Sequence, residues 1–131
     1  MSSIDRFMRD VPVEGLTCLD AGTGSGRMAR YLARKGAKLV YSISNNQEHL
    51  EYARSQCSGR ELRKIVFINA DLAKLDFLSV GTFDLITAHM LINVVPPVKL
   101  FTILKELTRV ARKGAILVLI DYNPLSTYQT S

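Results

Sequence analysis

Residues 16–26, LTCLDAGTGSG, decide the fold of this chain. The stretch opens with an apolar run typical of a buried strand and then reaches Asp20. Three alternating glycines follow: Gly22, Gly24 and Gly26. After them, apolar residues recur at spacings of three and four, which predicts a helix. The glycines therefore lie where a strand leads into a helix, which is where open α/β sheets bind ligands.

A glycine loop at this place is suited to an anionic ligand. Glycine adopts positive φ freely, and without Cβ it lets a ligand lie against the backbone. The first amides of the next helix lack partners and carry partial positive charge, so they favour a carboxylate or phosphate. The dinucleotide pattern G-x-G-x-x-G would need glycine at position 27, where this chain has Arg27. A purely structural turn is the alternative.

The observed spacing, D-x-G-x-G-x-G, resembles motif I of the class I S-adenosylmethionine (SAM)-dependent methyltransferases. The run AGTGSGRMARYLARKGA is particularly similar to the small-molecule methyltransferases related to ubiquinone/menaquinone biosynthesis enzymes, and TRVARKGAILVL is again similar to the family. The resemblance covers nearly the whole chain from Leu16 to Ile120. It implies one domain, 1–131, with an α/β doubly wound (Rossmann-like) parallel sheet of order 3-2-1-4-5. Relative to the family, the sheet lacks the usual last two strands.

Strand and helix patterns alternate along the rest of the chain. The predicted strands after the first are 38–43, 64–69, 83–88 and 115–120, the last of a kind buried on both faces. The predicted helices include 4–8, 47–57, which the Ser58-Gly59 pair ends, and 98–111. The side chains expected to face inward from these helices are Ile4, Phe7, Met8, Leu50, Ala53, Cys57, Phe101, Leu104, Leu107 and Val110.

The resemblance also implies a cofactor site for SAM, with S-adenosylhomocysteine (SAH) as product and no metal. The methionine carboxylate would lie near the helix amides after Gly24, and its ammonium near Asp20 and the Gly22 carbonyl. Adenosine would lie across Ser44 to Asn46 and Asp71-Leu72. The implied cofactor-binding residues are Asp20, Gly22, Thr23, Gly24, Gly26, Ser44, Asn45, Asn46, Asp71 and Leu72.

The chain departs from the family at the end of its second strand. The family has an acidic residue there that accepts hydrogen bonds from both ribose hydroxyls, whereas the alignment places Ser44 at this position, followed by two asparagines. Neutral hydrogen bonds are roughly half as strong as charge-assisted ones, so we expect weaker cofactor binding. A helix N-cap role for Asn45 or Asn46 is the alternative, as it is for Asp71 before a helix over 72–78.

His89 is the only candidate general base, at the end of the fourth strand. Methyl transfer from a sulfonium is an in-line displacement, in which orientation of the acceptor supplies most of the rate. A structural role for His89 is therefore the alternative.

Composition limits the possible partners. The 131 residues are 47% hydrophobic and 22% charged with a net charge of +5. This charge allows a nucleic-acid partner but does not favour one, because the basic residues are spread over helix ends and polar helical faces. No apolar run is long enough to span a bilayer and residues 1–10 lack a signal-peptide core, so a cytoplasmic protein is expected. The two cysteines form neither a disulfide framework nor a zinc motif.

Three hypotheses follow: a small-molecule methyltransferase, which we favour, an RNA-directed methyltransferase, or a non-catalytic SAM-binding or partner subunit with this fold. Only eleven residues follow Ile120 in the sequence, so 115–120 is expected to form an apolar sheet edge. A homodimer is the favoured cover for this edge. The alternatives are the tail 121–131 folding back, or another chain.

Overall fold

The computed structural model describes residues 3–89 and 95–120, so the predicted role of the tail 121–131 lies outside the described residues. The elements alternate along the chain as α1 (Ser3–Phe7), β1 (Thr17–Ala21), α2 (Arg27–Arg34), β2 (Leu39–Ser44), α3 (Gln47–Ser55), α4 (Gly59–Leu62), β3 (Ile65–Asn69), β4 (Phe83–His89), α6 (Pro97–Val110) and β5 (Ala111–Ile120).

The five strands form one parallel sheet in the order β3-β2-β1-β4-β5, which confirms the predicted topology. β1 lies in the middle and pairs with β2 on one side and β4 on the other. The chain leaves β1 toward β2 and later returns to its opposite side, so the strand order reverses at β1. The glycine loop follows β1 directly and thus occupies the point where sheets of this type bind ligands.

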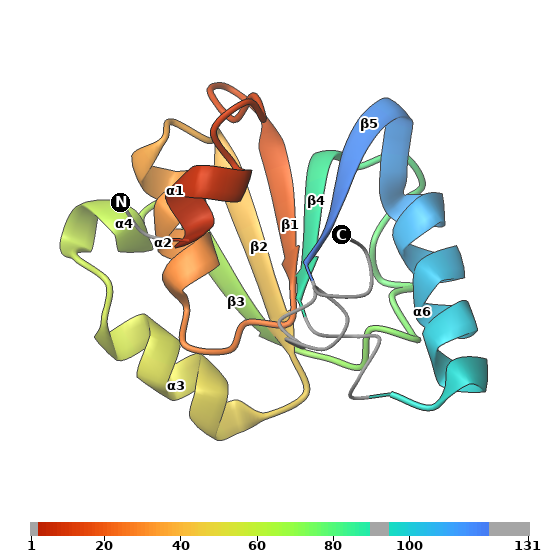
Figure 1. Ribbon diagram of the computed structural model, residues 1–131. Helices are drawn as coiled ribbons and strands as arrows, with labels where there is room; N and C mark the ends of the chain where they lie inside the picture. Colours follow the sequence, from red (N-terminus) through yellow and green to blue (C-terminus); the bar gives the residue numbers. More distant parts are fainter. Residues whose placement is uncertain (1–2, 90–94, 121–131) are drawn as a thin grey trace.

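Helices cover both faces of the sheet, with α1 to α4 on one side and α6 on the other (Figure 1). Successive residues of a strand point to opposite faces, so Cys18 packs in one apolar cluster and Leu19 in the other. The first cluster joins the sheet to α1 and α2 through Ile4, Met8, Met28 and Leu32. The second joins it to α6 through Ile103, Leu107 and Val110. No helix within the described ranges is long and apolar enough to cross a membrane.

The structure corrects two helix predictions. α3 ends at Ser55, and Ser58 begins a further short helix: its Oγ accepts from the Glu61 amide (3.1 Å), while Glu61 Oε1 accepts from the Ser58 amide (2.8 Å). The sequence pattern predicts only a helix end here, whereas Ser58 and Glu61 form a reciprocal capping box. Phe7 and Phe101 were expected to face inward but are exposed. On α6 the buried stripe runs through Ile103 instead, because several apolar spacings of three and four overlap there.

β5 also differs from the prediction. It begins at Ala111, four residues earlier than expected, and its pairing with β4 contains an irregularity between Phe83 and Leu85. The prediction that this strand is buried on both faces was wrong, because Ile116, Leu117 and Leu119 are exposed. β5 is the last strand on its side of the described sheet.

Candidate functional site

The three loop glycines all have positive φ, but their surroundings differ. A Cβ on Gly24 (φ 52°) would meet no atom within 4 Å. A Cβ on Gly26 (φ 86°) would lie 2.7 Å from the Ala53 Cβ, so Gly26 lets the loop pack closely on α3. Gly24 therefore leaves open space beside the loop, whereas Gly26 serves packing within the fold.

The loop amides divide into used and available donors. The Gly22 and Thr23 amides both donate to the Ile43 carbonyl, at 2.9 and 3.2 Å. Within the described part of the chain, the Gly24 and Ser25 amides donate to no backbone carbonyl. They immediately precede α2, whose N-terminus carries partial positive charge, so this end of the loop is suited to an anionic group.

A buried polar network lies beneath the loop. Ser42 Oγ on β2 donates to Asp20 Oδ2 at 3.0 Å, and Thr87 Oγ1 on β4 donates to Oδ1 at 3.3 Å. Ser42 Oγ also lies 2.9 Å from Thr23 Oγ1. Because Ser42 gives its proton to Asp20, the Thr23 hydroxyl donates to Ser42. The network connects three central strands to the loop.

Asp20 is completely buried and lines none of the cavities described below. Burial raises the pKa of its carboxyl to about 7, although the hydrogen bonds from Ser42 and Thr87 oppose this shift. Its side chain therefore supports the loop from below. The expected contact with a methionine ammonium stays a prediction.

His89 ends β4 and lies above the same carboxyl, with Nδ1 3.9 Å from Asp20 Oδ1. Burial lowers the pKa of the imidazole, while a hydrogen bond with the Gly22 backbone opposes that shift. The neutral ring is therefore favoured near pH 7, which is the form a general base requires.

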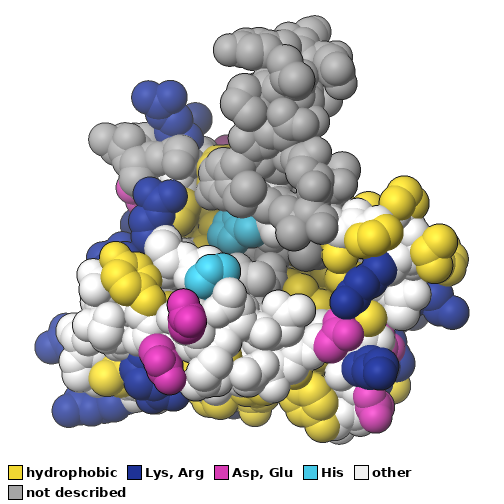
Figure 2. Space-filling model, turned by 90° about the horizontal axis from the view of Figure 1, so that it is seen from below, with side chains coloured by type: hydrophobic (Ala, Val, Ile, Leu, Met, Phe, Trp, Pro, Cys, Tyr) yellow, Lys and Arg dark blue, Asp and Glu magenta, His cyan; other side chains and the backbone are white. Residues whose placement is uncertain are grey.

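Two cavities meet at the glycine loop. One, of about 320 Å³, is lined by Ile4, Ser25, Arg27 and Met28. The other, of about 280 Å³, lies over the ends of β2 and β3 and is lined by Ser44, Asn45, Asp71 and Leu72. Gly22, Thr23, Gly24 and His89 line both. Figure 2 shows this edge of the sheet from below, with the histidine side chains near the centre of the face.

At the end of β2, two of the three residues at which the chain differs from the family line the cavity. Ser44 and Asn45 line the cavity, and Ser44 Oγ accepts a hydrogen bond from the Asn46 amide at 3.1 Å. Asn46 Oδ1 accepts from the His49 amide at 3.1 Å and caps α3. The N-cap alternative therefore holds for Asn46, which does not line the cavity.

Asp71 is already engaged on two sides. Oδ1 accepts from the Ala73 amide at 2.9 Å, and Oδ2 lies 3.5 Å from Lys99 Nζ. The Ala73 hydrogen bond and the Lys99 charge lower the pKa of this carboxyl. The alternative helix over 72–78 does not form, since residues 72 and 73 make a turn.

Four residues of this cavity have no place in the sequence-based prediction: His49, Val95, Lys99 and Ile103. Lys99 had a detectable signal, because a lysine in the first turn of a helix opposes the helix dipole and needs an acidic partner. His49 had none, since one histidine near a helix start is unremarkable. Among the described residues, no three His, Cys, Asp or Glu side chains are grouped as a metal site.

Comparisons with known proteins agree with this geometry. A family model described as a methyltransferase domain matches residues 18–114. The chain is 26% identical over 113 residues to the ribosomal protein L11 methyltransferase of Thermotoga maritima, covering 86% of this chain and 39% of that protein.

Solved structures share the fold. A SAM-dependent methyltransferase from Aquifex aeolicus is 30% identical with a TM-score of 0.74, covering 91% of this chain and 63% of that one. The [4+2]-cyclase SpnF is 26% identical with a TM-score of 0.76, covering 88% and 43%. The chain thus spans between 39% and 63% of the length of these three relatives.

The raised pKa of Asp20 predicts a pH-dependent stability. Between pH 4 and 7 the folded state keeps a proton that the unfolded state has lost, so this contribution is full below the unfolded pKa of 3.8 and disappears as the pH rises through about 7. Asp20→Asn cannot titrate. Denaturant unfolding should therefore show the variant gaining stability relative to the wild type from pH 4 to 7, with no further gain above.

Asp84→Asn is the matched control with the opposite sign. The Thr17 amide and Arg112 lower the pKa of Asp84, so its contribution is present above the unfolded pKa and is lost as the pH falls. His89, whose lowered pKa acts in that same direction, remains in both variants. Parallel pH profiles for Asp20→Asn and the wild type would contradict a buried carboxyl with a raised pKa.

Proposed function

Since this chain belongs to the class I SAM-dependent methyltransferase family, we propose that it binds SAM across the C-terminal edge of its sheet and methylates a small-molecule acceptor. The observation that carries this proposal is the meeting of two cavities at Gly22–Gly24 and His89. The narrower relation to ubiquinone/menaquinone biosynthesis enzymes stays a prediction.

The two cavities have different linings, which supports the proposal that they bind different parts of the cofactor. The larger one contains the Gly24 and Ser25 residues, whose amides are available for a methionine carboxylate, beside apolar Ile4 and Met28. The smaller one offers polar Ser44 and Asn45 for a ribose and apolar Leu72 for an adenine face. Asp71 remains the proposed acceptor for the adenine amine, in competition with Lys99.

When bound, SAM supplies an electrophilic methyl group on a sulfonium, and its transfer releases the neutral thioether SAH. The loop residues hold the cofactor in one orientation, so that the acceptor can approach in line. His89 lines both cavities and is favoured in its neutral form, so it can accept the proton that an acceptor hydroxyl or amine releases. Asp20 lines neither of these cavities. It fixes the loop through Ser42 and Thr23.

A macromolecular acceptor is the second candidate, because the curated relative methylates a ribosomal protein according to its name. The basic side chains on the face in Figure 2 are distributed around the rim and form no continuous stripe, which does not favour RNA. A tRNA affinity that falls steeply with salt would support the RNA-directed reading. The relation to a cyclase keeps a non-methylating role as a third candidate, which methyl-transfer assays distinguish.

Gly24→Val tests the cofactor site. The side chain would fill the open space beside the loop, so calorimetric titration should show that SAH binding is abolished. Gly15→Val is the matched control: Gly15 also has positive φ (76°) and open surroundings, but it lines neither loop cavity. Both variants should lose a similar amount of stability, about 1–2 kcal/mol. Normal SAH binding by Gly24→Val would place the cofactor elsewhere.

Ser44→Asp should strengthen SAH binding by about 1 kcal/mol, because an ionised acceptor bonds ribose hydroxyls more strongly than a neutral one. Lys99 lines the same cavity and offsets part of the cost of the added charge. Ser79→Asp, at an exposed position outside the cavity, controls for charge alone. If folded Ser44→Asp and the wild type bound SAH with equal affinity, the ribose would contact Asn45 instead, or Ser44 would not be the position that aligns with the family's acidic residue.

The proposal includes a homodimer through β5. Its outer edge is unpaired in the described sheet and displays the exposed side chains of Ile116, Leu117 and Leu119, and such an edge templates another strand. A two-fold pairing of β5 with its copy would bury these side chains. The tail 121–131 and a different chain remain the alternative occupants.

Light scattering at micromolar concentration should therefore give about twice the chain mass of 14.6 kDa. Leu119→Lys should restore the monomer mass, because it places a charge at the interface. Val80→Lys, at a more exposed position outside β5, should leave the dimer intact. A wild-type monomer with full methyl-transfer activity would refute the homodimer.

A further inference from the structure

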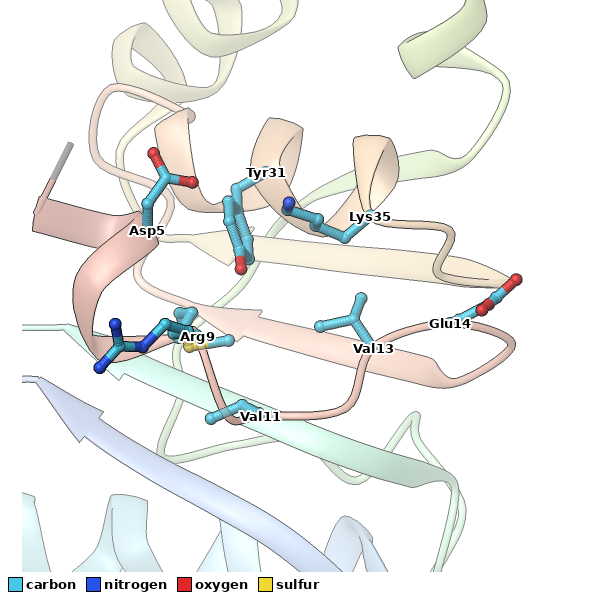
Figure 3. Close-up of a pocket in the computed structure, with 8 residues that line it drawn as sticks. Asp5, Arg9, Val11, Val13, Glu14, Tyr31 and Lys35 are labelled. Carbon is cyan, nitrogen blue, oxygen red and sulfur yellow. The ribbon is translucent and has the colours of Figure 1, made fainter. Parts of the chain in front are cut away.

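A third cavity, of about 580 Å³, lies away from the glycine loop. Figure 3 shows it between α2 and the segment that joins α1 to β1. α1 separates it from the loop, because Ile4 lines the loop cavity while Met8, one turn later, lines this one. Nothing in the proposed methyl transfer uses it.

One wall of this cavity is apolar. Met8 and Val13 are buried in the first apolar cluster, and Val11 packs against that cluster. Tyr31 on α2 also lines the cavity. An apolar part of a ligand would therefore exchange water for these side chains.

The polar groups beside this wall are hydrogen-bond donors. Tyr31 is largely buried (6% exposed), and its phenol hydroxyl is a hydrogen-bond donor on a residue that lines the cavity. Lys35 Nζ lies 5.6 Å from the centre of the same ring. Burial, and then the nearby Asp5, raise the pKa of Tyr31, so the phenol keeps its proton at neutral pH and is a donor.

The two acidic residues of the lining, Asp5 and Glu14, lie at opposite ends of the group. In Figure 3 the Glu14 carboxylate lies at the far end of the group, and the Asp5 carboxylate points away from Val11 and Val13. Arg9 adds a second cation at the edge of the cavity. The centre of the cavity therefore combines an apolar wall with two donors, one of them charged.

We propose that this cavity is a second ligand site, which binds a small amphipathic carboxylate independently of the cofactor. The apolar part would lie against Met8, Val11 and Val13, and the carboxylate would accept hydrogen bonds from Tyr31 Oη and Lys35 Nζ. An ammonium and a phenol together suit an anion with two acceptor oxygens.

Calorimetric titration of the full chain with octanoate tests this site. Lys35→Gln should weaken octanoate binding about fivefold, since an exposed ion pair contributes up to about 1 kcal/mol. Tyr31→Phe should weaken it by a similar factor, because it removes one donor and keeps the ring. Arg34→Gln removes a neighbouring charge on α2 outside the cavity and should bind octanoate like the wild type. 1-Octanol, which lacks the charge, should bind the wild type more weakly than octanoate.

Two further arms separate this site from the cofactor site. Octanoate affinity should be unchanged in Gly24→Val and in wild-type protein saturated with SAH, whether or not the chain transfers methyl groups. Competition between SAH and octanoate would place octanoate in the loop cavities and overturn the proposal. The proposal would also be overturned if the wild type did not bind octanoate. Equal octanoate affinities of the wild type and Lys35→Gln, a substitution at an exposed position, would overturn it too.

Discussion

The buried carboxyl of Asp20 is the constraint on which the rest of this site depends. Asp20 lies near the C-terminal end of β1 and accepts hydrogen bonds from Ser42 on β2 and Thr87 on β4. One side chain therefore connects three adjacent strands. Through Ser42 the network reaches Thr23, and this fixes the loop above the sheet. A buried polar group is tolerated only when it is hydrogen-bonded, and this requirement selects one loop position.

The loop conformation converts this constraint into open space at the sheet edge. The Gly22 and Thr23 amides donate to the Ile43 carbonyl. The Gly24 and Ser25 amides, just before α2, remain available as donors. Gly26 brings the loop against Ala53, and Gly24 keeps the adjoining cavities open. His89, at the end of β4, lies beside Asp20 and lines both cavities. Binding and support are thus divided between residues that are neighbours in sequence.

The family resemblance predicted the strand order, while the alternating strand and helix patterns and the motif around Gly22 are local signals that predicted an α/β sheet and the glycine loop. The inward face of α6 was not predicted correctly, because closely spaced apolar residues permit several registers. The spacing favours Phe101, whereas Ile103 is the buried residue. The Asp71–Lys99 pair and the cavity beside Tyr31 join residues far apart in the chain, so no local pattern reports them. Asp20 was found for its motif, but its burial beneath the loop depends on tertiary packing.

The central claim is that the open space beside Gly24 receives an adenosyl sulfonium cofactor and not a dinucleotide. Calorimetric titration of the wild-type chain with SAM, SAH and NADH, in the same buffer, tests it most directly. Saturable binding of SAM and SAH at one site, with NADH binding absent or far weaker, is the predicted result. Equal affinity for NADH, or no binding of SAM and SAH by the folded chain, would contradict it.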